Sequence, residues 1–184
     1  MKEKQIARKK FLEKRKTLTK KEIMYKSHLI EKNLFAFEKF INSKNIMFFV
    51  SFGKEPFTHE IINKSFSNKT VLIPKVFGDN LISCRINSLK ELRKGAYGIP
   101  EPMEENFFSV KKIDCVLVPG LAFSIKGERI GYGKGYFDRF LEKTIAYRIG
   151  TCFDEFVTEK IVTDQYDVNV DAIVTDKRLI VVNK

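Results

Sequence analysis

The sequence predicts an α/β fold, a three-layer sandwich with a largely parallel central sheet flanked by helices. Segments with apolar residues at helical spacing alternate with short segments that are apolar throughout. Continuous apolar runs of this length are typical of strands that are buried on both faces. The 184 residues contain no internal repeat and no Pro/Gly/Ser-rich linker, so we expect one α/β domain over residues 1–184.

Two helices are expected before the first strand, within residues 3–40. Residues 3–16 predict a basic helix. Thr19 and Glu22 have the spacing of a capping box, which opens the second helix. A mostly apolar stripe then continues at helical spacing, so we expect this helix to extend along it: Ile23, Ser27, Ile30, Leu34, Phe37 and Ile41.

After these helices the hydrophobic period changes. The continuous apolar run in residues 45–51 predicts a buried strand, and residues 58–66 predict a helix. The remaining expected elements are strands at 70–74, 81–86, 114–118, 145–151, 172–175 and 179–182, and a short helix at 136–143. Ligands in such folds bind at the carboxyl ends of strands, so we expect the site after Val50, Val118 and Thr151.

The formal net charge of +11 is concentrated near the N-terminus. Residues 1–32 carry +8, with 12 Lys and Arg against 4 Asp and Glu. Such a segment could bind nucleic acid. However, Phe11 and Tyr25 are its only aromatic residues, which leaves no stacking platform for bases. A field of this sign also attracts anionic small molecules, so the charge alone does not decide the partner.

The cysteines and the absence of long apolar runs predict a cytoplasmic location. Cys84, Cys115 and Cys152 show no C-x-x-C spacing and read as reduced thiols in the core. The chain begins with lysines rather than an apolar signal region. No apolar run approaches the ~18 residues of a membrane span. We therefore expect a cytoplasmic monomer with no membrane partner.

The segment 129–139, Arg-Ile-Gly-Tyr-Gly-Lys-Gly-Tyr-Phe-Asp-Arg, is the most informative part of the chain. Its three alternating glycines allow the backbone amides to approach a ligand closely. Lys134 and Arg129 supply positive charge for a phosphoryl group, and a simple turn would need neither of them. The spacing is neither that of a P-loop nor that of the dinucleotide fingerprint. Bare amides and two cations predict a phosphate-binding loop.

Three charged residues extend this prediction. Lys4 and Arg8 lie four residues apart and share one helix face. They could bind a phosphate or a carboxylate if that helix folds back over the glycine loop, and otherwise they form a solvated basic face. Asp138 is either a magnesium ligand, since Mg²⁺ favours oxygen, or a favourable acid in the first turn of a helix.

Further acids and histidines give weaker signals. Asp167 and Asp171 precede an expected strand, where either could supply a second carboxylate near the metal or simply form a turn. His28 and His59 have no evident nucleophile partner in the sequence, so packing or surface roles are expected for both.

Together these segments resemble the 5-formyltetrahydrofolate cyclo-ligase family, whose members are also called methenyltetrahydrofolate synthetases. The resemblance covers nearly the whole chain, and the glycine loop is its most specific part. The other pieces are weak singly but occur in the right order. The matching segments are Lys4-x-x-x-Arg8, 55–58 (Glu-Pro-Phe-Thr), 97–102 (Tyr-Gly-Ile-Pro-Glu-Pro), 118–123 (Val-Pro-Gly-Leu-Ala-Phe), 129–139 and 167–175.

The resemblance implies a ring closure that depends on ATP and magnesium. The formyl oxygen of 5-formyltetrahydrofolate would attack the γ-phosphate of ATP. The neighbouring anilino nitrogen would then attack the phosphorylated, imine-like intermediate. Loss of phosphate would leave 5,10-methenyltetrahydrofolate, ADP and phosphate. The protein would mainly position both substrates and screen charge.

The resemblance also implies a role for each matching position. The catalytic residues would be Lys134 at the transferred phosphate, Arg129, and Tyr136 near the formyl group. Magnesium would be held by Asp138 and Asp167. The expected ATP contacts are Lys4, Gln5, Ile6, Ala7, Arg8, Arg129, Ile130, Gly131, Tyr132, Gly133, Lys134, Gly135, Tyr136 and Phe137. The expected folate contacts are Arg8, Val50, Glu55, Tyr97 and Tyr136, with Glu55 pairing with the N–H donors of the pterin.

Four positions depart from the family pattern. Phe57 stands where a polar residue is more common, Ser124 where Asp is frequent, Phe137 where a second Tyr is common, and Tyr166 where His is frequent. The main candidate residues are retained. The leading hypothesis is therefore a ligase with small-molecule substrates and no nucleic-acid partner.

Two alternatives from other classes stay open at the level of the sequence. A nucleic-acid-binding module would use residues 1–32, and its affinity would fall steeply with salt. A sugar-phosphate isomerase would use the glycine loop for a monophosphate and would not need ATP.

Overall fold

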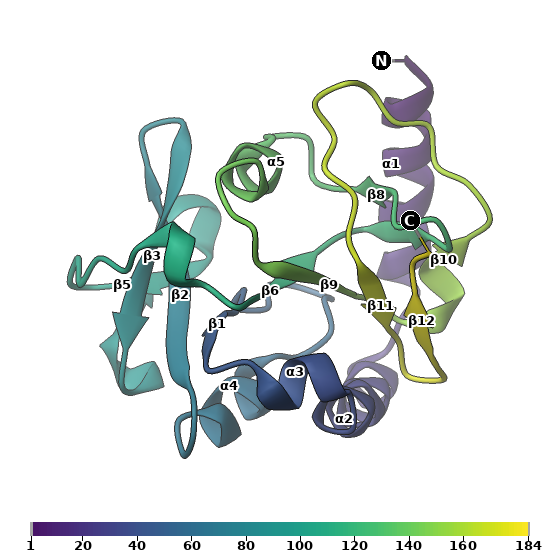
Figure 1. Cartoon of the computed structure of the whole chain (residues 1–184). Helices are drawn as coiled ribbons and strands as arrows, with labels where there is room; N and C mark the ends of the chain where they lie inside the picture. Colours follow the sequence, from purple (N-terminus) through teal and green to yellow (C-terminus); the bar gives the residue numbers. More distant parts are fainter. Residues whose placement is uncertain (1, 184) are drawn as a thin grey trace.

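A seven-stranded sheet runs through the middle of the molecule, with helices above and below it (Figure 1). This computed structural model describes residues 2–183. The strand order is β12-β11-β9-β6-β1-β2-β3, and the inner strands pair in parallel. The inner strands are β11 (Ala172–Val174), β9 (Tyr147–Thr151), β6 (Cys115–Pro119), β1 (Asn45–Met47) and β2 (Thr70–Phe77). The antiparallel edge strands are β12 (Leu179–Val181) and β3 (Asn80–Ile86). The predicted, largely parallel α/β sheet is confirmed.

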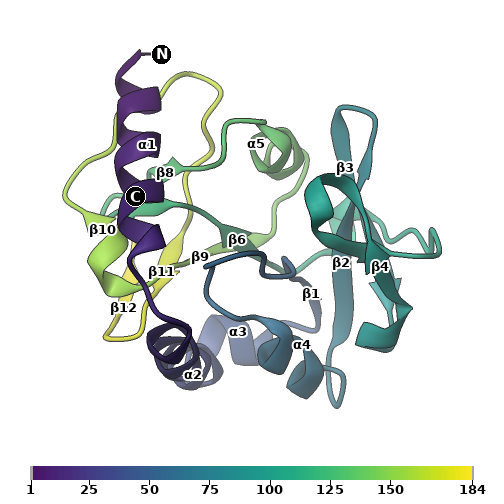
Figure 2. The ribbon, with the colours of Figure 1, turned by 180° about the vertical axis from the view of Figure 1, so that it is seen from behind.

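Helices lie on both sides of this sheet. One side carries α2 (Lys20–Phe35), α3 (Glu38–Asn42) and α4 (His59–Ser65), and the other carries α5 (Tyr136–Leu141) (Figure 1). Seen from behind, α1 (Lys2–Lys16) runs alongside β8 (Arg129–Ile130) and then leads into α2 (Figure 2). Within residues 2–183, the helices are too short or too polar for a membrane span.

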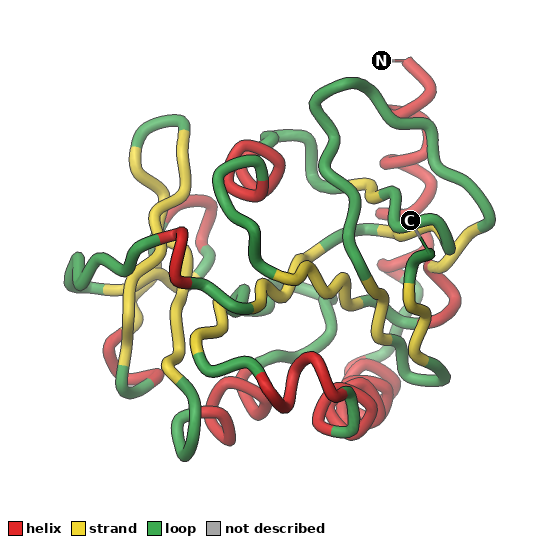
Figure 3. The backbone as a smooth tube through the Cα atoms, in the orientation of Figure 1, coloured by secondary structure: helices red, strands yellow, loops and turns green. Residues whose placement is uncertain are grey.

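Several elements are too short to leave a pattern in the sequence, and they were not predicted. Long loops, drawn in green in Figure 3, connect many of the elements. The strands are β4 (Leu92–Lys94), β5 (Pro100–Pro102), β7 (Ala122–Ser124), β8 and β10 (Val157–Thr158). The 3₁₀ turns are η1 (Leu89–Glu91), η2 (Ala96–Gly98), η3 (Val110–Lys112) and η4 (Asp154–Phe156).

The second predicted helix begins as expected but ends early. The Thr19 hydroxyl accepts from the Glu22 amide at 3.2 Å, and the Glu22 carboxylate accepts from the Thr19 amide at 2.8 Å, so the capping box is confirmed. The prediction of one helix along the whole stripe is wrong, because Phe37 is extended (φ −85°, ψ 116°) and α3 starts after it. Phe37 is buried at this break, so the apolar pattern continues although the helix does not. Ile41 is 51% exposed.

The predicted bounds of three strands and one helix need correction, and the strand predicted at 70–74 extends to Phe77. The first strand ends at Met47 rather than at residue 51, although the following apolar residues stay buried. A continuous apolar run predicts that residues are buried, but it does not predict which of them form hydrogen bonds with a neighbouring strand. The strand predicted from residue 145 starts at Tyr147, since Ile145 is 92% exposed. The helix predicted to residue 143 ends at Leu141.

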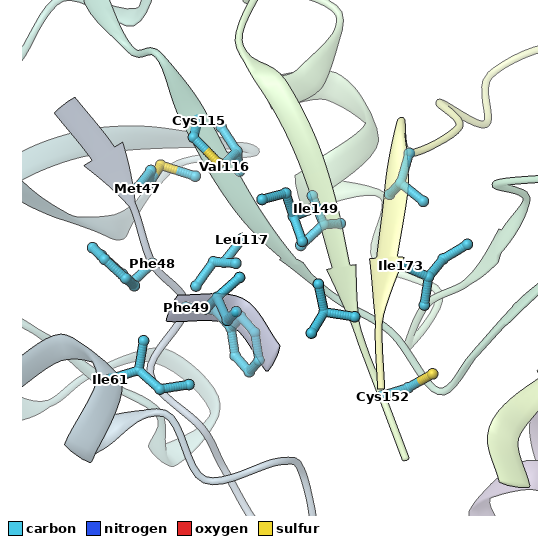
Figure 4. Close-up of a cluster of buried hydrophobic side chains, with 14 of the residues drawn as sticks. Met47, Phe48, Phe49, Ile61, Cys115, Val116, Leu117, Ile149, Cys152 and Ile173 are labelled. Carbon is cyan, nitrogen blue, oxygen red and sulfur yellow. The ribbon is translucent and has the colours of Figure 1, made fainter. Parts of the chain in front are cut away.

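The core fills both faces of the sheet, because successive side chains along the parallel strands alternate between the α2–α4 layer and the opposite side and are buried on both. In Figure 4, Met47, Leu117, Ile149 and Ile173 come from four neighbouring strands, and all four are fully buried. Cys84, Cys115 and Cys152 are buried free thiols, as the sequence predicts. This packing holds the carboxyl ends of β1 and β6 next to each other, where the candidate site forms.

Gly150 in β9 tests how tightly this core is packed. A Cβ atom at this position would lie 2.5 Å from Cε1 of Phe123, whose ring is fully buried. Because the ring has no free space to move into, we expect Gly150→Ala to lower the free energy of unfolding by about 1–3 kcal/mol, measured by urea denaturation.

The matching control is the same substitution in a Phe123→Leu background. The smaller, flexible side chain relieves the contact, so Gly150→Ala should there be nearly neutral relative to Phe123→Leu alone. An equal loss of stability in both backgrounds would show that the contact with Phe123 is not the cause.

Candidate active site

The glycine loop, residues 131–135, connects β8 to α5. Gly133 and Gly135 adopt positive φ angles of 94° and 68°, which L side chains rarely take. A Cβ at Gly133 would lie 3.1 Å from Cζ of Arg8, and one at Gly135 would lie 2.7 Å from Nη1 of Arg139. The backbone conformation favours glycine at these positions, whereas the two flexible arginine ends would move aside for a Cβ atom.

Helix α1 folds back over this loop. This is the arrangement in which Lys4 and Arg8 could bind a phosphate or a carboxylate. The Arg8 Nε atom donates to the Gly131 carbonyl at 2.9 Å. On the opposite side, Arg139 donates to the Lys134 carbonyl at 3.1 Å. The loop is therefore held between a guanidinium from α1 and a guanidinium from α5.

Arg129 is buried beneath the loop, where it bridges two elements. Its Nη2 atom pairs with Oδ1 of Asp138 at 2.6 Å, and its Nη1 atom donates to the Pro119 carbonyl at 3.2 Å. In the described part of the chain, its buried Nε atom has no hydrogen-bond partner. Arg129 thus ties the end of β6 to the first turn of α5.

The two predicted magnesium ligands lie close together. The Val168 amide donates to Oδ1 of Asp138 at 3.3 Å, so Asp138 reaches the residue next to Asp167. Lys4 pairs with Asp167 and, at 2.8 Å, with Asp164. Although partial burial opposes it, hydrogen bonding to Asp164 and Asp167 raises the pKa of Lys4. Each carboxylate therefore already has a cationic partner. No cluster of three or more possible metal ligands occurs within residues 2–183.

Tyr97, Lys134 and Tyr136 lie close together in the structure. The Tyr97 hydroxyl lies 3.5 Å from the Tyr136 hydroxyl, and the Lys134 ammonium lies 5.4 Å from the centre of the Tyr97 ring. Tyr97 adopts a φ of 56°, which is uncommon for a residue other than glycine. This strained turn directs its ring towards the glycine loop.

Glu55 lies on the loop that follows β1, and its carboxylate is buried. Its Oε2 atom accepts from the Phe52 amide at 2.9 Å, and its Oε1 atom accepts from the Tyr132 hydroxyl at 2.9 Å. Arg15 Nη1 donates to the same hydroxyl at 2.9 Å and lies 4.0 Å from Oε1 of Glu55. Burial raises the pKa of Glu55, opposed by the Phe52 amide, Arg15 and Tyr132.

The sequence analysis missed Arg15. It is one of 12 basic residues in the N-terminal segment, and nothing in the sequence distinguishes it from its neighbours. In the structure it is 4% exposed, whereas most of the other basic residues on α1 face solvent. Only the packing of α1 identifies it.

A pocket of about 650 Å³ opens beside Glu55, between the α1–α2 junction and the loop after β1. Volumes of this size are typical of small-molecule sites. Its walls combine basic, hydroxyl and apolar side chains, including Lys16, Leu18, Thr19, Ile23, Met24, Ser51 and Phe57. Val50 is buried and is not among the lining residues.

The remaining residues of the predicted ATP site differ in their exposure to solvent. Gln5 and Ile6 are exposed, whereas Ala7 and Phe137 pack against the core and Ile130 is buried.

Three further polar residues, Asp171, Asp154 and Ser124, make contacts that stabilise the scaffold. Asp171 accepts from the Arg148 amide at 2.8 Å within the sheet region. Asp154, which follows β9, pairs with Arg178 at 2.8 Å. The Ser124 hydroxyl accepts from two local amides, those of Lys126 and Glu128, at 3.2 Å each.

The fold and this site define an α/β protein with a glycine-rich loop flanked by cationic side chains and a pocket beside Glu55. A family model described as the 5-formyltetrahydrofolate cyclo-ligase family matches residues 1–176. The chain therefore belongs to the 5-formyltetrahydrofolate cyclo-ligase family. The predicted class, a ligase enzyme of folate one-carbon chemistry acting on small molecules, is confirmed.

Curated relatives and solved structures agree with this assignment. The mouse 5-formyltetrahydrofolate cyclo-ligase is 31% identical, with 77% of this chain and 78% of that protein covered. The enzyme of the same name from Saccharomyces cerevisiae is 32% identical, with 72% of this chain and 76% of that protein covered. The 5,10-methenyltetrahydrofolate synthetase of Aquifex aeolicus has a TM-score of 0.91 and 31% identity, covering 98% of this chain and 93% of that one. The comparisons favour the ligase over the nucleic-acid-binding and isomerase alternatives.

His59, at the start of α4, gives the site region a testable pH dependence. Its Nδ1 atom lies 3.2 Å from the Ser51 hydroxyl, and its ring stacks on Phe57 with centroids 4.5 Å apart. Burial lowers the pKa of His59 below its usual 6.5. Because the unfolded chain then binds the proton more readily, the free energy of unfolding should fall as the pH decreases below 6.5.

We expect a His59→Gln variant to show a flatter profile over this window than the wild type. Urea denaturation at about pH 7.5 and about pH 5.5 measures both slopes. Parallel profiles for the two proteins would contradict the assigned role of burial.

Proposed function

We propose that the chain converts 5-formyltetrahydrofolate to 5,10-methenyltetrahydrofolate with consumption of ATP in the presence of Mg²⁺. One observation carries the proposal: the cation-lined glycine loop contacts the buried carboxylate of Glu55 directly, through Tyr132. This reaction requires a polyphosphate and a pterin side by side, and the contact joins the residues proposed to bind each of them.

The triphosphate of ATP would lie along the glycine loop. The surrounding charges support this placement, since Arg8 and Arg139 contact the loop and Lys134 is exposed on it. Lys134 is proposed to neutralise charge on the transferred phosphoryl group, with Arg129 supporting the loop from below. The nucleotide would extend between residues 4–8 of α1 and residues 129–137.

The pterin would be bound by Glu55, whose two oxygens each keep a lone pair for the N–H donors of the ring. The adjoining pocket has room for a small aromatic group beside Glu55. Tyr97 and Tyr136 would form the wall between the folate and Lys134, which fits the 3.5 Å separation of their hydroxyls. Arg8 and Val50 are proposed as further folate contacts.

The chemistry follows from bringing the two substrates together. The formyl oxygen attacks the γ-phosphorus and ADP leaves, which converts a poor leaving group into phosphate. The anilino nitrogen then attacks the activated carbon and closes the ring, and phosphate departs. The chain's own residues orient the reactants and stabilise the transferred charge, and no covalent step with the protein is needed.

Asp138 and Asp167 are proposed to hold the magnesium of Mg·ATP. Two carboxylates suffice, because Mg²⁺ in phosphate sites keeps several waters and phosphate oxygens as ligands. The adjacency of Asp138 and residue 168 supports a shared site. The ion would screen the negative charge of the phosphates during transfer.

The central prediction concerns the three-component reaction. ATP, Mg²⁺ and 5-formyltetrahydrofolate together should generate the near-ultraviolet absorbance of the methenyl product, and omission of any one component should abolish it. The measurement is continuous spectrophotometry on folded protein. No absorbance change with all three components present would disprove the proposed function.

Lys134→Ala tests the phosphoryl-transfer role. We expect kcat to fall by about 10²–10³-fold, because the variant loses charge stabilisation in the transition state. The affinity for 5-formyltetrahydrofolate should change far less, since Lys134 is proposed to contact the phosphate. Lys111→Ala, which alters an exposed lysine on η3, is the control and should keep wild-type kinetics. Equal losses in kcat and folate affinity would refute the assignment.

A further inference from the structure

The side chain of Tyr132 makes contacts that its position in the glycine loop does not predict. Its ring is half exposed, but its hydroxyl lies between Glu55 and Arg15. The hydroxyl donates to Oε1 of Glu55 at 2.9 Å and accepts from Nη1 of Arg15 at 2.9 Å. Partial burial raises its pKa, and it therefore remains a donor at neutral pH.

We propose that Tyr132 is a positioning residue that couples nucleotide binding at the glycine loop to folate binding at Glu55, with Arg15 as its fixed anchor. This inference rests on the proposed function and deepens it. Tyr132 itself is assigned no chemical step. Its role is to make the conformation of one substrate site depend on the other.

Arg15 can serve as an anchor because it is held on several sides. Its Nη2 atom donates to the Gly120 carbonyl at 2.7 Å, at the carboxyl end of β6. Its guanidinium also lies 5.4 Å from the centre of the Phe156 ring. A buried guanidinium with these partners has little freedom to follow the loop.

Glu55 is held less firmly, and Tyr132 supplies part of its support. Its Oε2 atom is fixed by the Phe52 amide within its own turn, but its Oε1 atom depends on the Tyr132 hydroxyl. Without that donor, the buried carboxylate would keep only one hydrogen bond at normal distance among the described contacts, with Arg15 at 4.0 Å. A charge-assisted bond to a buried carboxylate is strong, so the Glu55 conformation is sensitive to the loop.

The coupling follows from this shared hydrogen bond. The loop conformation that keeps the Tyr132–Glu55 bond is also the one that presents Glu55 to the pterin. A ligand that selects this conformation at one site lowers the free energy of binding at the other. The coupling is reciprocal, so ATP tightens folate binding by the same factor by which folate tightens ATP binding.

Tyr132→Phe tests the coupling, because it keeps the ring and removes only the hydroxyl. The Kd of the magnesium complex of a non-hydrolysable ATP analogue is measured by calorimetry with and without saturating 5-formyltetrahydrofolate. For the wild type we expect the folate to lower this Kd by about 5–50-fold. For Tyr132→Phe the ratio should fall to within about twofold of unity, while each ligand still binds alone.

Tyr25→Phe is the matched control, since Tyr25 is an exposed tyrosine on α2, and it should keep the wild-type ratio. A general loss of stability does not change a ratio of affinities in folded protein, so the readout separates coupling from a purely structural role. If Tyr132→Phe keeps the wild-type ratio of Kd values, the inference is overturned. It is also overturned if the wild type binds both ligands with a ratio of one. Neither outcome affects the proposed function. Failure of wild type to bind either ligand overturns the proposed function and the inference with it.

Discussion

The structure of the site depends on one buried charge, the guanidinium of Arg15. Burial of a charge is unfavourable unless partners replace its water, and here a tyrosine hydroxyl and a backbone carbonyl do so. These partners come from the glycine loop and from the end of β6. The anchored α1 therefore extends across the loop and places Arg8 on Gly131. Arg15 acts together with the Arg8 contact and with the packing of Phe11 and Leu12 on the core to fix the position of the helix.

The charges of the site are arranged so that a ligand can exchange partners with them. Arg129 is neutralised by Asp138 and Lys4 by Asp167. A polyphosphate that carries a divalent cation brings both signs of charge. In the proposed binding of Mg·ATP, the phosphates would pair with the basic groups and the magnesium with the carboxylates. Binding of this kind replaces existing ion pairs and leaves no buried charge without a partner, which avoids the main energetic penalty of such sites.

The sequence and the structure agree where elements are long and differ where they are short. The capping box at Thr19 and the apolar run of β6 are local signals with a direct physical cause, and both are confirmed. The break at Phe37 left no signal, since a buried residue at a helix junction continues the hydrophobic stripe. Two-residue strands such as β8 form because a neighbouring strand is present, and sequence periodicity does not report that neighbour.

For the site, the sequence alone determined the glycine spacing, the cations within the loop, and the resemblance that assigns the family. These depend on residue types close together in the chain. Only the tertiary structure decided which of the N-terminal basic residues is buried, where the Tyr132 hydroxyl points, and that Asp138 and Asp167 lie close together. Burial and direction arise when segments distant in sequence pack together, and a buried charge is stable only where that packing supplies its partners.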